Sequence, residues 1–307
     1  MSLLSLIAVF LIEQLQPLDY RRIVADPVGA WADLVESRFN AGAVRHGALA
    51  WCVAVLVPVM LIAIAYWVLH ALNPLLGWVL NVGVLYVTMG FRQFSHHYTE
   101  IQLALRMGDL ERARQLLAEW QGISTYGLGA EDIARLSIEG ALAASHRHVF
   151  AVVFWFVLLP GPCGALLYRL ASIVHQRWNV ESEVRQTDFS TFSRRVFGMI
   201  EWLPSRATAA AFAIVGDFED AVYCWRTQPA QWPDRDLGIV LAAGAGALGV
   251  QLGRPVIEGA EVSDRAELGL GDPADVDFMQ SAVGLVWRAT VVWMLLLFLL
   301  GLATLAG

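Results

Sequence analysis

Lysine is absent from the 307-residue sequence, so all 21 basic residues are arginines, and 28 acidic residues outnumber them. The formal net charge of −7 leaves no basic stripe for a phosphate backbone, which excludes nucleic acid as an expected partner. Cysteine is scarce as well: Cys52, Cys163 and Cys224 lie far apart and form no CxxC pair. This excludes a disulfide framework and a zinc knuckle, and we expect the three side chains to pack as apolar groups.

Charged residues of either sign are few. They make up 16% of the sequence, against 57% hydrophobic residues, and the mean hydropathy is +0.54. This composition predicts a polytopic membrane protein rather than a water-soluble one. No stretch alternates polar and apolar residues for long, and no internal repeat is visible. We therefore expect an all-α fold, a membrane helix bundle with helical extramembrane segments, in contact with the lipid bilayer.

Apolar runs predict four membrane spans. One uncharged run of about 45 residues would extend about 68 Å as a helix, twice the roughly 30 Å thickness of the hydrocarbon layer. It therefore holds two spans, near 48–69 and 75–91, separated by an Asn-Pro turn. A third span is expected near 149–168 and a fourth near 285–306.

A Pro-Gly-Pro sequence at 160–162 divides the third apolar run near its middle. It either kinks one spanning helix or turns the segment back as a re-entrant hairpin, whose freed backbone groups would have to be buried in protein. We favour the kinked span. The chain 1–307 is then one integral-membrane domain, with helical polar regions at 92–147 and 171–282.

Three further helical features are expected. In the first polar region, apolar residues recur at helical spacing on both sides of Gly108-Asp109, which predicts a helical hairpin arm. The uncharged, glycine-rich stretch 237–253 predicts a buried or re-entrant helix, because small residues allow helices to approach closely. The apolar residues 1–12 lack a basic region and a cleavage site, so they predict a membrane-embedded or interfacial helix rather than a signal peptide.

The seven histidines predict no metal site. Two ligands on one helix need a spacing of three or four residues, which His96-His97 and His146-His148 lack. His96 and Glu100 have this spacing, but so do many surface pairs. No Walker loop, GxGxxG, HExxH or GxSxG motif is present, which excludes ATP binding by a familiar motif.

Acidic residues near the membrane are the stronger candidates for function, since a carboxylate there is costly unless it is paired or faces a polar cavity. Glu139 stands ahead of the third apolar run, and Asp217 and Glu219 follow an apolar run of about ten residues. The plain interpretation is solvation at the interface or pairing with arginines such as Arg206. The functional interpretation is a catalytic or substrate-binding role.

Five short phrases occur in a fixed order along the chain: VRHGALAW at 44–51, GDL at 108–110, WLPSR at 202–206, GALGVQLG at 246–253, and LG at 268–269 followed by DV at 275–276. Together they resemble the CobD/CbiB membrane family over nearly the whole chain. That family includes adenosylcobinamide-phosphate synthase. The resemblance implies an enzyme that joins an activated carboxyl group of cobyric acid to aminopropanol or its phosphate, with ATP and magnesium.

The resemblance also implies a set of acids around the third span that hold magnesium against phosphates. Glu139 matches the first of them, whereas the other positions carry Ala143, Ala144, Arg147, Ser172 and His175. Arginine and histidine at cation positions argue against synthase chemistry. The third span, together with 202–206 and 216–218, resembles the AmpE branch of the same superfamily, whose members are described as inner-membrane modulators associated with β-lactamase induction.

Two functional hypotheses follow from the resemblance. The first is a non-synthase, AmpE-like protein of the bacterial inner membrane that binds a protein partner or a corrinoid-like ligand. The alternative is a cobinamide-phosphate synthase-like enzyme of cobalamin biosynthesis, and ATP and magnesium are expected only in that case. The candidate catalytic residues are Glu139, Asp217 and Glu219. The candidate substrate-binding residues are Arg45, Arg206 and Asp275.

Overall fold

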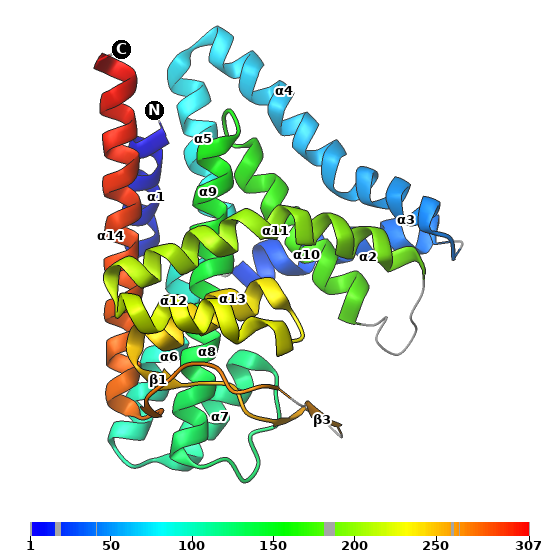
Figure 1. The fold of residues 1–307 in the computed structure, drawn as a ribbon. Coiled ribbons are helices and arrows are strands. Elements are labelled where there is room, and N and C mark those ends of the chain that lie inside the picture. The colour runs from blue at the N-terminus through cyan, green and yellow to red at the C-terminus, as the bar shows by residue number, and fades with distance from the viewer. Residues whose placement is uncertain are drawn as a thin grey trace. The chain divides into compact units, whose positions relative to one another are not determined.

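The computed structural model describes residues 2–15, 20–40, 42–180, 188–258, 261–263 and 265–306, and most of these residues form helices, joined by loops and two short strand pairs (Figure 1). The expected all-α class is confirmed. The chain divides into two compact units, Met1–Gly90 with Ala151–Pro204, and Phe91–Phe150 with Ser205–Gly307. The single domain expected over 1–307 stays a prediction.

The first unit contains seven α-helices, two π-helical turns and the first part of α11 in the described residues. In order these are α1 (Ser2–Leu15), η1 (Arg21–Ala25), α2 (Asp26–Phe39), α3 (Val44–Trp51), η2 (Cys52–Leu56), α4 (Val57–Leu72), α5 (Pro74–Thr88), α9 (Ala151–Leu158), α10 (Cys163–Val180) and α11 (Asp188–Val215).

The second unit contains the rest of α11 and all the strands of the described residues. Its other elements are α6 (Phe91–Arg106), α7 (Leu110–Gln121), α8 (Ala130–Ser145), η3 (His146–Phe150), α12 (Phe218–Thr227), η4 (Pro229–Gln231), α13 (Arg235–Leu248), β1 (Val250–Gln251), β2 (Val256–Glu258), β3 (Glu261–Ser263), β4 (Asp272–Pro273) and α14 (Val276–Ala306). β1 pairs in parallel with β4, and β2 pairs antiparallel with β3.

Three helices of the described chain are long and apolar enough to cross a membrane, namely Val44–Leu72, Ala130–Leu158 and Val276–Ala303. The first contains the span expected near 48–69, and the third overlaps the one expected near 285–306. The span expected near 75–91 corresponds to the shorter apolar helix α5. These helices fit a membrane protein, and which of them cross the bilayer stays a prediction.

The segment 149–168 is not one kinked helix. α9 ends at Leu158, α10 begins at Cys163, and the two helices pack against each other (Figure 1). Gly161 adopts the left-handed conformation, with φ +66°, that an L side chain disfavours, and a Cβ atom at Gly164 would overlap the Trp155 carbonyl. The chain therefore turns back at 159–162, as in the re-entrant alternative. The apolar helix that enters this turn begins upstream of the expected span, at Ala130.

Within the first unit, α11 contains a proline, and the helical hydrogen bond that this proline cannot make is replaced by a side-chain donor. Pro204 lies in α11 and has no N–H to donate to the carbonyl of Ile200, four residues earlier. The indole Nε1 of Trp155 donates to that carbonyl at 3.2 Å. The freed acceptor is thus satisfied by another helix of the same unit.

Within the second unit, the expected hairpin arm is confirmed as α6 and α7, which pack together. Gly108, with φ +75°, breaks the helix, and Asp109 caps α7 by accepting from the Arg112 N–H at 3.0 Å. The arm is joined to α14 because the buried Tyr98 hydroxyl donates to the Met279 carbonyl at 2.7 Å. Burial raises the pKa of this phenol.

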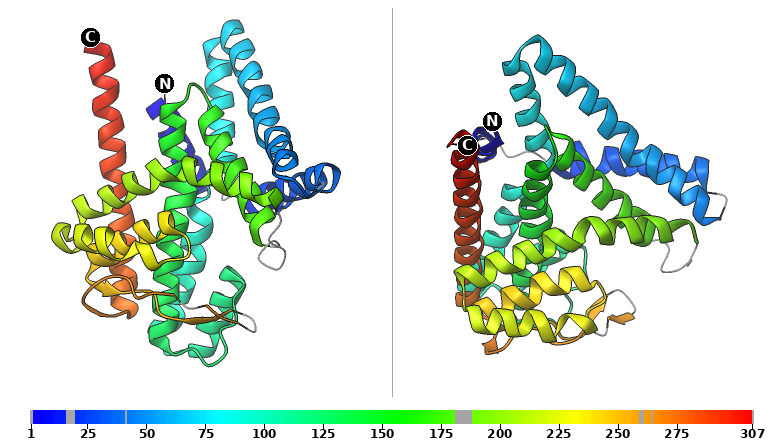
Figure 2. Two further views of the ribbon diagram at one scale, coloured as in Figure 1. Left: turned by 45° about the vertical axis from the view of Figure 1, so that its right-hand side comes forward. Right: turned by 45° about the horizontal axis from the view of Figure 1, so that its top comes forward.

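The glycine-rich stretch forms the buried helix α13, which packs side by side with α12 (yellow in Figure 2). A Cβ atom at Gly246 would lie 2.5 Å from the Asp220 carbonyl oxygen of α12, so the close approach requires glycine. Cys224 on α12 is fully buried, and burial raises its thiol pKa to about 11. All three cysteines are free, and Cys224 packs as expected.

Candidate functional site

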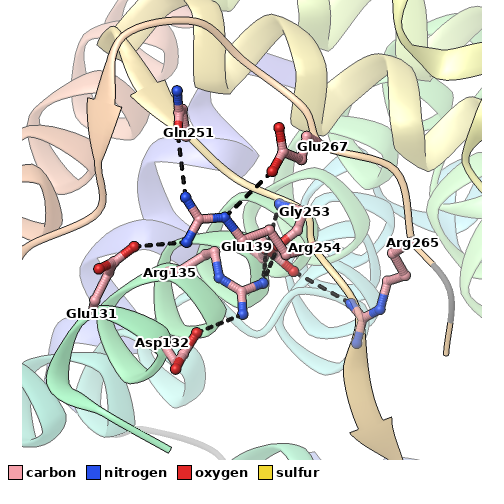
Figure 3. A network of polar contacts seen from close by, with 9 residues as sticks. All are labelled: Glu131, Asp132, Arg135, Glu139, Gln251, Gly253, Arg254, Arg265 and Glu267. Carbon is pink, nitrogen blue, oxygen red and sulfur yellow. Dashed lines mark hydrogen bonds and ion pairs between the residues drawn. The ribbon is translucent and has the colours of Figure 1, made fainter. Parts of the chain in front are cut away.

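A buried carboxylate on α8 lies within a network of polar contacts (Figure 3). The Glu139 side chain is 6% exposed. Its Oε1 accepts from the Gly253 N–H at 2.9 Å and from Arg135 at 3.4 Å, one helical turn away. Its Oε2 accepts from Arg265 at 3.3 Å. Two guanidinium groups and one backbone donor thus converge on a single carboxylate.

The loop after α13 brings these donors to α8. Gly249 ends the helix in the left-handed conformation, and Leu252 exchanges backbone hydrogen bonds with Leu268. Gly253 also has a positive φ, +82°, and a Cβ atom there would overlap the Ala266 carbonyl oxygen. Only glycine therefore fits the tight loop. Its carbonyl accepts from Arg135, whose other amino group donates to Asp132 at 2.9 Å.

Arg254 follows in a strained conformation. With φ 78°, it is the one residue other than glycine in the described chain with a positive φ. Its guanidinium contacts Glu131 at 2.8 Å, Gln251 at 3.3 Å and Glu267 at 3.6 Å. These contacts join the strained backbone to the start of α8 and to the returning chain (Figure 3).

Arg265 differs from the other arginine on Glu139. Its side chain is 16% exposed, whereas that of Arg135 is 3% exposed. Its guanidinium carbon also lies 5.8 Å from the centroid of the Trp232 ring, within range of a cation–π contact. Arg265 therefore contacts both a carboxylate and an indole, and it is the more exposed of the two arginines.

A second polar cluster surrounds η3, the π-helical turn between α8 and α9. Buried His146 shares a hydrogen bond of 2.9 Å with buried Thr208. Arg147 contacts Asp234 at 3.4 Å. On α11, Arg206 contacts Asp236 at 2.8 Å. Such π-turns are often found at functional sites.

The other candidate residues have separate structural positions. Asp217 and Asp275 are helix caps: Asp217 accepts from the Asp220 N–H, and Asp275 accepts from two backbone N–H groups at the start of α14. Glu219 lies exposed in the first turn of α12, and Arg45 lies exposed on α3 in the first unit. The described contacts thus join Glu139 and Arg206 to polar clusters and assign helix capping to the two aspartates.

Sequence reasoning missed Arg135, Gly253 and Arg265. The spacing of four residues between Arg135 and Glu139 was a visible signal for an ion pair on one helix face. Arg265 lies 126 residues from Glu139, and no local pattern connects the two. Gly253 stood within a phrase used for the family resemblance, but its role as a donor depends on the loop conformation.

The donors around Glu139 do not fit a magnesium site. Magnesium prefers oxygen ligands in octahedral geometry, whereas Glu139 is surrounded by two arginines and a backbone N–H. Among the residues with described positions, no group of three or more His, Cys, Asp or Glu side chains could hold a metal ion.

The sequence matches a known protein family and several of its members. The family model described as CobD/Cbib protein matches residues 22–286. The chain is 36% identical over 300 residues, 96% of each chain, to cobalamin biosynthesis protein CobD of Stutzerimonas stutzeri (strain A1501). It is 36% identical over 230 residues to the CobD protein of Chromobacterium violaceum, covering 75% of this chain and 73% of that protein.

A more distant relative carries the second family name. Cobalamin biosynthesis protein CbiB of Salmonella typhimurium is 25% identical over 233 residues, which cover 74% of this chain and 72% of that protein. No solved structure matches at a significant level. These comparisons do not support the AmpE-like interpretation as the leading one, and they make the alternative, cobalamin biosynthesis, at least as well supported.

Proposed function

Since the chain belongs to the CobD/CbiB family of membrane proteins, we propose that it is a cobinamide-phosphate synthase-like enzyme of cobalamin biosynthesis in the bacterial inner membrane. It would join a carboxyl group of cobyric acid to the amine of aminopropanol or its phosphate. The observation that carries this proposal is the full-length similarity to the Stutzerimonas stutzeri CobD protein. The corrinoid and the amino alcohol are then its substrates.

The Glu139 cluster supplies chemistry that fits this reaction. An activated carboxyl group must be kept from water, and Glu139 lies in a buried environment closed by the Gly253 loop. The carboxylate is also held by cationic groups, so its charge is compensated where solvent is excluded. ATP would activate the acid, and magnesium would be bound mainly by phosphate oxygens rather than by the acids of this cluster.

Genetic complementation tests the proposed function. The chain is expressed in a bacterium that lacks cobinamide-phosphate synthase, cobyric acid is supplied, and cobalamin-dependent growth is measured after membrane expression is verified. We expect growth with the wild-type chain and none with Glu139→Gln. Glu119→Gln is the matched control, because Glu119 is exposed on α7 outside the cluster and should be dispensable. Failure of well-expressed wild-type protein to restore growth contradicts the proposal.

One observation favours a second candidate function. Arg147 stands where the family resemblance implies an acid, and its guanidinium is bound to Asp234. An arginine there suits a protein that keeps the family fold and binds a ligand or protein partner without synthase activity. Deletion of the gene distinguishes the two functions: loss of cobalamin supports the enzyme, and an unchanged cobamide pool with an altered cell-wall response supports the modulator.

A further inference from the structure

The surroundings of the Arg265 guanidinium are those of a cation-binding site. Glu139 Oε2 lies 3.3 Å from one of its nitrogens, and the Trp232 ring centroid lies 5.8 Å from its central carbon. A carboxylate together with an aromatic face is the combination that binds organic ammonium groups. Arg265 fills this position with a cation that belongs to the protein itself.

Arg265 differs from the other partners of Glu139 in its exposure and in the oxygen atom that it contacts. Gly253 and Arg135 hold Oε1 and are fixed by the loop backbone and by Asp132. Arg265, on Oε2, is the more exposed of the two arginines, at 16% against 3%. Among the described residues it is the one partner of Oε2. A change of partner at Oε2 therefore leaves both donors of Oε1 in place.

A buried carboxylate needs a cation at all times, because an uncompensated charge in a dry environment is costly. A neutral molecule that displaced Arg265 would leave Arg135 as the one cation of the described residues on Glu139, and Oε2 without a charged partner. A primary ammonium restores it, with up to three N–H donors for the carboxylate and the Trp232 ring. The exchange of one cation for another keeps the charge of the cluster unchanged, which selects amines over their neutral analogues.

We propose that Arg265 occupies the place of a substrate ammonium group, and that a small amino alcohol binds Glu139 Oε2 and the face of Trp232 by displacing Arg265. This inference rests on the proposed function, because the amine is one of the two groups that the synthase joins. Glu139 is then the amine-binding residue. Arg265 is a positioning residue that keeps the site charged and closed until the amine arrives.

Trp232 provides a direct readout, since removal of a guanidinium from its ring changes its fluorescence. The full chain, purified in detergent, is titrated with 1-amino-2-propanol, and the signal of a Trp232→Phe variant is subtracted. We expect a saturable change in the difference signal. The matched ligand control is 1,2-propanediol, which has similar size and no charge, and it should give no change. An equal response to both compounds overturns the proposal.

Variants of Arg265 distinguish a displaced cation from a merely structural one. Because Arg265 competes with the amine, Arg265→Gln should tighten binding of 1-amino-2-propanol by about tenfold, measured by thermal stabilisation as well as by fluorescence. Arg265→Lys keeps a competing cation and should bind closer to the wild type. Glu139→Gln should abolish binding. Circular dichroism and the unfolding transition verify that each variant is folded. Weaker or unchanged amine binding by folded Arg265→Gln overturns the inference.

The binding experiment tests the role of Arg265, the complementation experiment tests the proposed function, and either result can be negative without the other. The titration needs neither cobyric acid nor ATP, so amine binding with the expected variant pattern supports the inference even if the chain does not restore cobalamin-dependent growth. Restored growth together with no tightening in Arg265→Gln supports the proposed function and overturns the role of Arg265.

Discussion

The two polar clusters of the second unit are built differently. Around Glu139, two arginines and a backbone N–H surround one carboxylate that is 6% exposed, and two of these partners, Gly253 and Arg265, lie more than 100 residues away in the sequence. Around η3, the pairs Arg147–Asp234 and Arg206–Asp236 are each one arginine with one aspartate, and their side chains are 18–42% exposed. The first cluster therefore depends on burial and a fixed loop, and the second on pairs that water can partly replace.

This difference predicts a gradient of mutational effects. Where a charge is buried, removal of one partner leaves another charge without compensation, and the cost is large. Where the groups are partly solvated, water replaces the lost partner and the cost is small. The clusters lie in one unit and share the helical run of α8 and η3, so differences between them report local burial and geometry.

The largest effect is expected for Glu139→Ala. It leaves Arg135, 3% exposed, and the Gly253 N–H without their carboxylate acceptor. The free energy of unfolding should fall by about 3–5 kcal/mol, as for other broken buried ion pairs. Chemical denaturation in detergent measures it. A loss below about 1 kcal/mol would place Glu139 with the partly solvated pairs and remove the contrast.

A substitution that removes no charge should also disturb the first cluster. Gly253→Ala forces an L side chain into φ +82° and a Cβ atom against the Ala266 carbonyl. We expect a loss of about 1–3 kcal/mol in the free energy of unfolding, since the backbone must shift and move the N–H away from Glu139. Gly249→Ala is the matched control: its φ is also positive, but a Cβ atom there meets nothing within 4 Å. Equal losses would show that strain alone, and not the loop contact, decides the effect.

The parts of the fold that the sequence predicted are those set by local pattern. The α6–α7 arm follows from helical spacing on both sides of Gly108-Asp109, and the all-α class follows from composition and the lack of alternation. The Pro-Gly-Pro break at 160–162 was visible, but its direction was not. A kink and a reversal have the same local sequence, and the choice depends on the packing of α10 against α9.

Of the candidate site, the sequence could indicate only the central carboxylate and its partner on the same helix. Glu139 stood out because an acid near an apolar run requires an explanation, and Arg135 had the right spacing to pair with it. Asp217 and Asp275 are also acids that a sequence search singles out, but the structure gives them another role. Each precedes a helix and caps it by accepting from a backbone N–H. Arg265 and Gly253 reach Glu139 through a loop whose course is set by left-handed glycines and one bridge to Leu268, which no periodicity encodes.

An intermediate effect is expected for the Arg206–Asp236 pair. The distance of 2.8 Å is that of a good charge-assisted hydrogen bond, and the two side chains are 22% and 18% exposed. A double-mutant cycle with Arg206→Met and Asp236→Asn should give a coupling energy of about 1 kcal/mol. Coupling as large as that between Arg265 and Glu139 in a parallel cycle would mean that exposure does not separate the clusters.

The smallest effect is expected for Arg147–Asp234, where the contact is 3.4 Å long and the side chains are 27% and 42% exposed. Asp234 also caps α13 by accepting from two backbone N–H groups, so the pair is best probed from the arginine. Arg147→Met should cost less than about 1 kcal/mol, and the difference from the wild type should shrink further as salt is raised to about 1 M. Glu139→Ala should keep its larger cost at the same salt concentration, because buried pairs are screened much less. Parallel denaturation series at low and high salt measure both variants, and a cost for Arg147→Met that persists at high salt would mean that η3 holds a buried charge as well.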